Sequence, residues 1–88
     1  MTAKGKRIRL SGHAREQLLY RGTTELEVNQ TIRRGEWGEA KLGRLQSELE
    51  FEFNAHWNEK FYTTKRVQPI FVEERDEIVV VTVYVYYF

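Results

Sequence analysis

The stretch that decides the fold class lies at residues 49–57 and reads LEFEFNAHW. Apolar side chains occupy every odd position from Leu49 to Trp57, and polar ones occupy the even positions between them. A period of two is typical of a strand that buries one face and exposes the other. We therefore expect a half-buried antiparallel strand, then a hairpin turn at Asn58 and Glu59 into a strand over residues 60–67. Residues 69–73, which begin with the single proline, are expected to continue as an extended edge or kinked segment.

A second β-prone stretch closes the chain at residues 78–88 and reads IVVVTVYVYYF. Both of its faces are apolar, and it carries no charge. Such a run at an exposed sheet edge would promote aggregation. The pattern therefore predicts a central strand, entered through a turn at Arg75 and Asp76.

The first third of the chain carries helix signals. Ser11 is a good N-cap for a helix that ends at Gly22, with Ala14 and Leu18 facing inward. Thr24 and Glu27 form a capping box at the start of a second helix, for which Gly35 supplies a left-handed C-cap. Residues 6–10 are suited to a short edge strand before the first helix.

These elements predict an α+β domain that spans residues 1–88 as a single unit. The expected architecture is an N-terminal helix pair packed on one face of an antiparallel sheet of about four strands, with the other face more open. No repeat, low-complexity tract or linker divides the 88 residues.

Composition narrows the classes of function. The chain has no cysteine, which excludes disulfide frameworks, thiolate zinc sites and cysteine nucleophiles. Its longest apolar run is shorter than a membrane helix requires, and its start lacks the apolar region of a secretory leader. We expect a cytoplasmic protein without membrane association.

Charge is distributed unevenly along the chain. The net charge is only +1, but residues 1–44 carry ten Lys or Arg against five Glu, whereas residues 45–88 carry four against eight Asp or Glu. A basic helical half is suited to facing phosphates, and it is equally typical of ordinary solvated helices.

A set of short motifs carries a family resemblance. They are His13-Ala14, Leu18, Arg21-Gly22, Thr31-Ile32, Gly35, Gly43-Arg44 and Val81-Thr82-Val83-Tyr84, with Lys60-Phe61-Tyr62, Lys65, Val67 and Pro69-Ile70 between them. The pattern resembles a family of small bacterial and cyanobacterial domains of unknown function. That family is in turn distantly similar to the RelE-like toxins of the barnase, EndoU, colicin and RelE fold. The resemblance implies a helix pair on an antiparallel sheet whose open face cleaves RNA.

RNA cleavage without a metal requires a base, an acid, and cations that stabilise charge on the reacting phosphate. His13, in the first turn of the first helix, is the first candidate for the acid or base. The alternative for His13 is a local packing or hydrogen-bonding role. The candidate phosphate-binding cations are Arg44, Lys60, Lys65 and Arg66, because they lie on the predicted sheet or its loops.

Aromatic residues accompany these cations. The candidates to stack on bases are Tyr62, Tyr84 and Tyr86, although aromatic residues with a period of two are also common as core or cross-strand pairs. Two histidines without a local ligand spacing make a poor metal site, and no glycine-rich phosphate loop occurs, so neither a metal nor a cofactor is expected.

The sequence therefore favours a metal-independent endoribonuclease-like toxin of a toxin-antitoxin pair. His13, Arg44, Lys60, Lys65 and Tyr84 are its candidate catalytic residues, and RNA and a small antitoxin protein are its candidate partners. The alternative is a noncatalytic module on the same fold that binds a protein or a nucleic acid.

Overall fold

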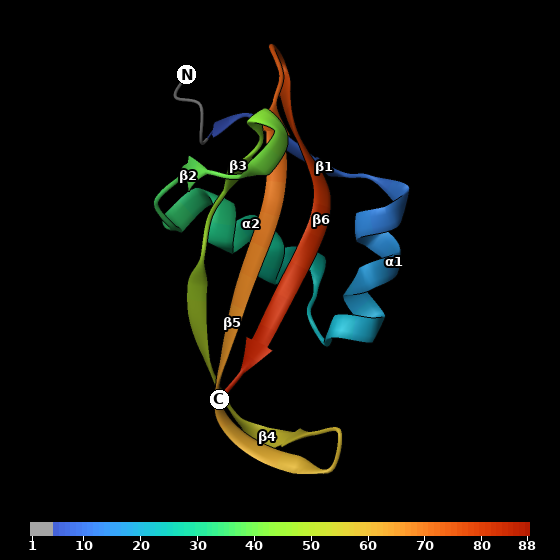
Figure 1. The fold of residues 1–88 in the computed structure, drawn as a ribbon, viewed down its shortest axis with the longest axis vertical. Coiled ribbons are helices and arrows are strands. Elements are labelled where there is room, and N and C mark those ends of the chain that lie inside the picture. The colour runs from blue at the N-terminus through green and yellow to red at the C-terminus, as the bar shows by residue number, and fades with distance from the viewer. Residues whose placement is uncertain (1–4) are drawn as a thin grey trace.

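The longest strand of the protein forms the middle of its sheet (Figure 1). The computed structural model describes residues 5–88. The helices are α1 (Gly12–Arg21) and α2 (Glu25–Arg34), and the strands are β1 (Arg7–Leu10), β2 (Gly38–Glu39), β3 (Leu45–Gln46), β4 (Leu49–Trp57), β5 (Lys60–Glu73) and β6 (Glu77–Tyr87). A 3-10 turn, Lys41–Gly43, connects β2 to β3.

The prediction of an antiparallel sheet of about four strands is wrong. The sheet has six strands in the order β1-β6-β5-β3-β2, with β4 also paired to β5, and β1 runs parallel to β6. Strands β2 and β3 are two residues long, which is too short for alternation to show in the sequence. The sheet is mixed because β1 lies beside a strand some 70 residues further along the chain, Ile8 facing Ile78.

The helices begin as the sequence predicts. The Ser11 hydroxyl accepts a hydrogen bond from the Ala14 N–H, and the Thr24 hydroxyl accepts one from the Glu27 N–H. Gly22 ends α1 with a left-handed φ of 75°.

The predicted left-handed cap at Gly35 is wrong, because its φ is −78°. A side chain at this position would instead collide with Ser47 and with the backbone of Glu48. The glycine is therefore required for close packing between the end of α2 and the chain leading into β4.

The two helices occupy different places on the sheet (Figure 1). Helix α2 covers one face and packs Val28 and Ile32 against β5. Helix α1 lies beside β6, where Gln17 accepts a hydrogen bond from the backbone N–H of Val83. The helix thus covers the part of the β6 edge that β1, which ends opposite Val80, leaves unpaired.

Strands β4 and β5 form the predicted hairpin. Burial alternates along the whole of β4, and Asn58 and Glu59 adopt the positive φ values, 51° and 71°, of a tight hairpin turn. A bulge at Asn54 interrupts the pairing of β4 with β5.

The last strand, β6, lies between β1 and β5 and is therefore internal to the sheet, as predicted. The middle position belongs to β5. It pairs with β6 along one edge and with β3 and β4 along the other, whereas β6 has strands on both sides only from Glu77 to Val80. The expectation of a sheet edge after Pro69 is wrong, because Ile70 and Phe71 pair with β3 on one side and with β6 on the other. Pro69 is tolerated in β5 because its carbonyl faces the junction between β3 and β4. Its missing N–H therefore breaks no ladder bond.

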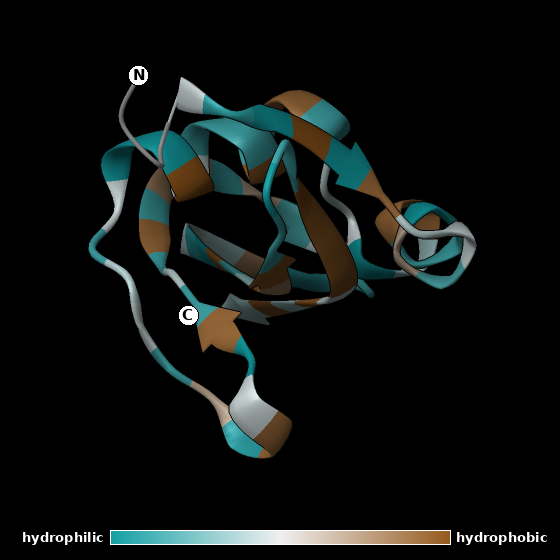
Figure 2. Cartoon of the chain, turned by 90° about the horizontal axis from the view of Figure 1, so that it is seen from above, coloured by the Kyte–Doolittle hydropathy of each residue, from teal (hydrophilic) through white to brown (hydrophobic). Residues whose placement is uncertain are grey.

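A single apolar core lies between α2, α1 and the sheet. Its buried members are Leu10, Ala14, Val28, Ile32, Val67, Phe71, Ile78, Val80 and Val83. Along the ribbons of Figure 2, brown apolar residues alternate with teal polar ones, as expected for elements with one buried face. Within residues 5–88, no helix covers the opposite face of the sheet (Figure 1).

Candidate nucleic-acid interface

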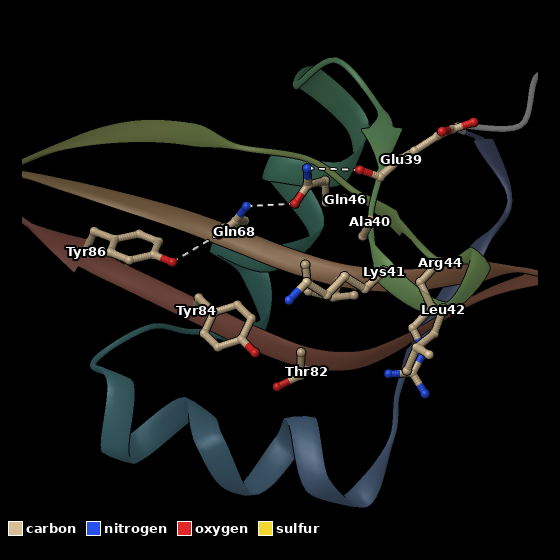
Figure 3. A pocket seen from close by; sticks show the side chains of 11 residues that line it. Glu39, Ala40, Lys41, Leu42, Arg44, Gln46, Gln68, Thr82, Tyr84 and Tyr86 are labelled. Carbon is tan, nitrogen blue, oxygen red and sulfur yellow. Dashed lines mark hydrogen bonds between the residues drawn. The ribbon is translucent and has the colours of Figure 1, made fainter.

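A groove crosses the face of the sheet that α2 leaves open (Figure 3). Its volume is about 750 Å³. Strands β5 and β6 provide the floor, which consists of Gln68, Ile70, Thr82, Tyr84 and Tyr86. Gln68 is paired with Tyr84 and Ile70 with Thr82, so these side chains necessarily project from the same face.

The loop of residues 40–44 forms one wall of the groove. Its ends are joined by a hydrogen bond of 2.8 Å from the Ala40 N–H to the Arg44 carbonyl. Leu42 at its tip has a left-handed φ of 63° and is 85% exposed. Lys41 and Arg44 line the groove, and within residues 5–88 neither forms an ion pair with a carboxylate. Their charges are therefore available to a ligand.

A chain of hydrogen bonds fixes the polar side of the groove. The Tyr86 hydroxyl donates to Gln68 Oε1 at 3.3 Å, and Gln68 Nε2 donates to Gln46 Oε1 at 2.8 Å. Gln46 Nε2 in turn donates to the backbone carbonyl of Glu39 at 3.1 Å. The chain, visible in Figure 3, holds the Tyr86 ring and two amides in place while the ring stays 48% exposed.

Helix α1 borders the groove on the side of β6. Gln17 accepts a hydrogen bond of 2.8 Å from the hydroxyl of Thr82, which lines the groove. One turn later, the Arg21 guanidinium lies over the Tyr84 ring at 5.6 Å from its centroid. His13 is exposed one turn before Gln17, so His13, Gln17 and Arg21 share one side of the helix.

The structure brings together some of the five predicted site residues. Arg44 and Tyr84 line the same groove, and His13 lies on the bordering helix. Lys60 lies at the start of β5, where its Nζ is 5.6 Å from the centroid of the Tyr62 ring, and it does not line the groove.

Lys65 lies on the helix-covered face of the sheet. Its Nζ donates to Glu27 Oε1 at 2.7 Å and to the Gly22 carbonyl at 3.0 Å, and its side chain is only 8% exposed. The sequence contains a signal for this placement, because odd and even positions of a strand point to opposite faces of the sheet. Lys65 is at an odd position, like the buried Val67 and Phe71, whereas Gln68 is at an even position.

Sequence reasoning missed Lys41, Gln17 and the two glutamines of the hydrogen-bonded chain. Lys41 belongs to a loop between two strands that are too short to detect. Gln17 is a mid-helix residue that no local pattern distinguishes. The placement of Gln68 could have been predicted, since it is at an even position of β5, like Arg66 and Ile70, and so lies on the same face as these residues.

The part of the chain that the structure describes contains neither a candidate metal site nor a candidate membrane-spanning helix. No group of three or more His, Cys, Asp or Glu side chains lies close enough to hold a metal ion within residues 5–88. None of the helices in this range is long and apolar enough to cross a membrane.

No protein-family model, curated protein or solved structure matches the chain.

Proposed function

We propose that this domain binds single-stranded RNA in the groove on the open face of its sheet. The observation that carries the proposal is the convergence of two cations with two exposed rings in one groove. The cations, Lys41 and Arg44, form no ion pair within residues 5–88, and the rings are those of Tyr84 and Tyr86. Cations beside stacking platforms are the usual combination for binding single strands, because cations attract the backbone and rings accept any base.

A single strand is favoured over a duplex by the exposure of the rings. Tyr84 is 40% exposed and Tyr86 is 48% exposed, and both belong to the floor of the groove. Bases inside a duplex are stacked on each other and cannot lie on a protein ring, whereas unpaired bases can.

The neighbouring acidic residues restrict the path that the RNA strand can take across the protein. Glu48, Glu50 and Glu52 occupy the exposed positions along β4 and its approach, and of these Glu50 is neutralised by Arg66 at 2.7 Å. In Figure 3, the Glu39 side chain points away from Tyr84 and Tyr86. A polyanion is therefore expected to follow the groove between α1 and the 40–44 loop rather than β4.

The test is binding of a fluorescein-labelled ten-nucleotide RNA by anisotropy. Tyr86→Ala should weaken binding roughly five- to a hundredfold, since one base-aromatic stack contributes about 1–3 kcal/mol. Phe61→Ala is the matched control, because Phe61 is 51% exposed but lies in the β4-β5 hairpin outside the groove. Equal losses in the two variants, or no binding by the wild type, would refute the proposal.

RNA cleavage is a second candidate function, and the observation that favours it is the position of His13 on the side of α1 that carries Gln17 and Arg21. In such a reaction His13 would take the proton of a ribose 2′-hydroxyl, whose oxygen attacks the adjacent phosphorus. The bond to the 5′-oxygen then breaks, that oxygen takes a proton from water, and a 2′,3′-cyclic phosphate remains while His13 returns its proton to the solvent.

Cleavage is tested with the same RNA in EDTA. The expected products carry a cyclic phosphate, and His13→Gln should reduce turnover far more than affinity. Binding without any cleavage would identify the noncatalytic module, and growth arrest on expression, relieved by a co-produced small protein, would identify a toxin.

A further inference from the structure

Gln17 is held by two hydrogen bonds to one end of its side-chain amide. Its Oε1 accepts from the Thr82 hydroxyl and from the Val83 backbone N–H, each at 2.8 Å. The orientation is unambiguous, because a backbone N–H only donates and the amide atom that faces it must be the oxygen.

The other end of the amide is unused. Within residues 5–88, Gln17 Nε2 donates to no protein acceptor. The only fully buried side-chain atom without a hydrogen-bond partner in that range is Asn29 Oδ1, so Gln17 Nε2 reaches solvent. The protein therefore presents a fixed N–H donor whose direction is set before any ligand arrives.

The surroundings of this donor indicate what it binds. Its anchor, Thr82, lines the groove, and Arg21 follows one turn later with its guanidinium over Tyr84. His13 precedes Gln17 by one turn, so the three side chains recur about every 6 Å along the helix at a rise of about 1.5 Å per residue. A neutral donor next to an arginine is suited to an anionic acceptor.

We propose that Gln17 binds a phosphodiester oxygen of the RNA strand and that α1 is the side of the groove along which the RNA backbone runs. The inference rests on the proposed function, since it assigns an orientation to the RNA in that groove. The bases then turn toward Tyr84 and Tyr86, and the phosphates turn toward the side of α1 that carries Gln17 and Arg21.

Gln17→Glu separates this role from a structural one. A carboxylate has the same shape and keeps both acceptor interactions with Thr82 and Val83, so the contact between α1 and β6 is retained. The change replaces only the free N–H donor with an oxygen, which repels a phosphate at that point.

Tyr20→Glu is the matched charge control. Tyr20 is 84% exposed on the same helix and does not line the groove, so the variant has a new negative charge at a similar place in the chain but away from the bound strand. We expect Gln17→Glu to weaken RNA binding by about tenfold or more and Tyr20→Glu by about threefold or less, since only the first acts at hydrogen-bonding distance.

Oligouridine, oligocytidine and oligoadenosine of equal length distinguish a phosphate from a base as the acceptor. Equal losses for the three strands in Gln17→Glu support the phosphate, whereas a loss confined to one base would overturn it. Equal losses in Gln17→Glu and Tyr20→Glu would also overturn it, while normal wild-type binding would leave the proposed function intact.

A measurement on the unaltered protein covers the case in which Gln17→Glu lowers the thermal midpoint. The side-chain NH₂ of Gln17 should shift in the ¹H-¹⁵N spectrum on addition of oligouridine and shift less when the phosphates are replaced by methylphosphonates. No shift at saturating RNA would refute the contact, and no RNA binding at all would refute both proposals.

Discussion

Lys65 of β5 lies 2.7 Å from Glu27 of α2, and this ion pair joins the helix to the covered face of the sheet. Thr23 donates a further hydrogen bond to the same Glu27 oxygen at 3.0 Å. Glu27 therefore uses its carboxylate for the sheet and for the turn between the helices. The pair accounts for a lysine on an otherwise apolar face.

Lys65→Met should lower the free energy of unfolding by about 2 kcal/mol, because it leaves a largely buried Glu27 without its cation. Lys60→Met is the control and should change stability little, since Lys60 is exposed. Urea unfolding measures both. A loss of RNA affinity with unchanged stability in Lys65→Met would instead place Lys65 in the binding site.

Burial and the nearby Glu27 raise the pKa of Tyr87 to about 12. The phenol also donates to the Arg21 carbonyl at 2.6 Å. An unfolded tyrosine loses its proton near pH 10, so the folded state keeps a proton that the unfolded state has lost. The contribution of the Tyr87 hydroxyl to the free energy of unfolding is therefore complete below about pH 10 and falls as the pH rises toward 12. The difference in unfolding free energy between wild type and Tyr87→Phe should shrink over that range, and a constant difference would contradict the assignment.

Gly22→Ala should be among the most damaging small substitutions. Gly22 has a φ of 75°, and a Cβ there would collide with the Tyr87 hydroxyl and would meet the Trp57 ring at 2.7 Å. Gly43→Ala is the matched control, since Gly43 has a φ of 72° but no atom within 4 Å of an added Cβ. We expect a loss of about 1 kcal/mol for Gly43→Ala from backbone strain and about 2–4 kcal/mol for Gly22→Ala, where the collision adds to the strain. Equal losses in thermal unfolding would contradict a collision with Tyr87 and Trp57 at this position.

Local signals in the sequence predict the helices and the hairpin correctly. The helix caps at Ser11, Thr24 and Gly22 bond to backbone groups within one turn, so their effect is visible in the local sequence. The alternation in β4 depends only on which face of the strand is buried. The parallel pairing of β1 with β6 depends on a contact across the whole chain, for which no local signal exists.

The site was harder to predict than the fold because it depends on which face each strand residue occupies. Arg44 and Tyr84 were chosen for their chemistry and lie in the groove, whereas Lys65 was chosen for the same reason and lies on the covered face. The face on which a lysine or arginine of a strand lies can be predicted from whether the buried apolar residues of that strand are at odd or at even positions. Lys41 and Gln17 depend on a loop and a helix edge that only the folded chain brings to β5 and β6.

Salt dependence of RNA binding distinguishes cations that contact phosphates from those that do not. Lys41 and Arg44 line the groove, whereas Lys60 is eight residues before Gln68 on β5, about 26 Å along an extended strand at 3.3 Å per residue. Each cation that contacts a phosphate releases a counterion from the RNA when it binds.

Lys41→Ala and Arg44→Ala should each reduce the slope of log affinity against log salt by about 0.7, and the double variant by about 1.4 if the two sites are independent. Lys60→Ala should leave both the slope and the affinity close to those of the wild type. Anisotropy titrations of the labelled ten-nucleotide RNA at four or more salt concentrations, roughly 50–300 mM, measure the slopes. A reduced slope in Lys60→Ala, with Lys41→Ala and Arg44→Ala unaffected, would move the RNA from the groove to the β4-β5 hairpin. The groove is supported only if the charge effect and the stacking loss in Tyr86→Ala are found on the same face of the sheet.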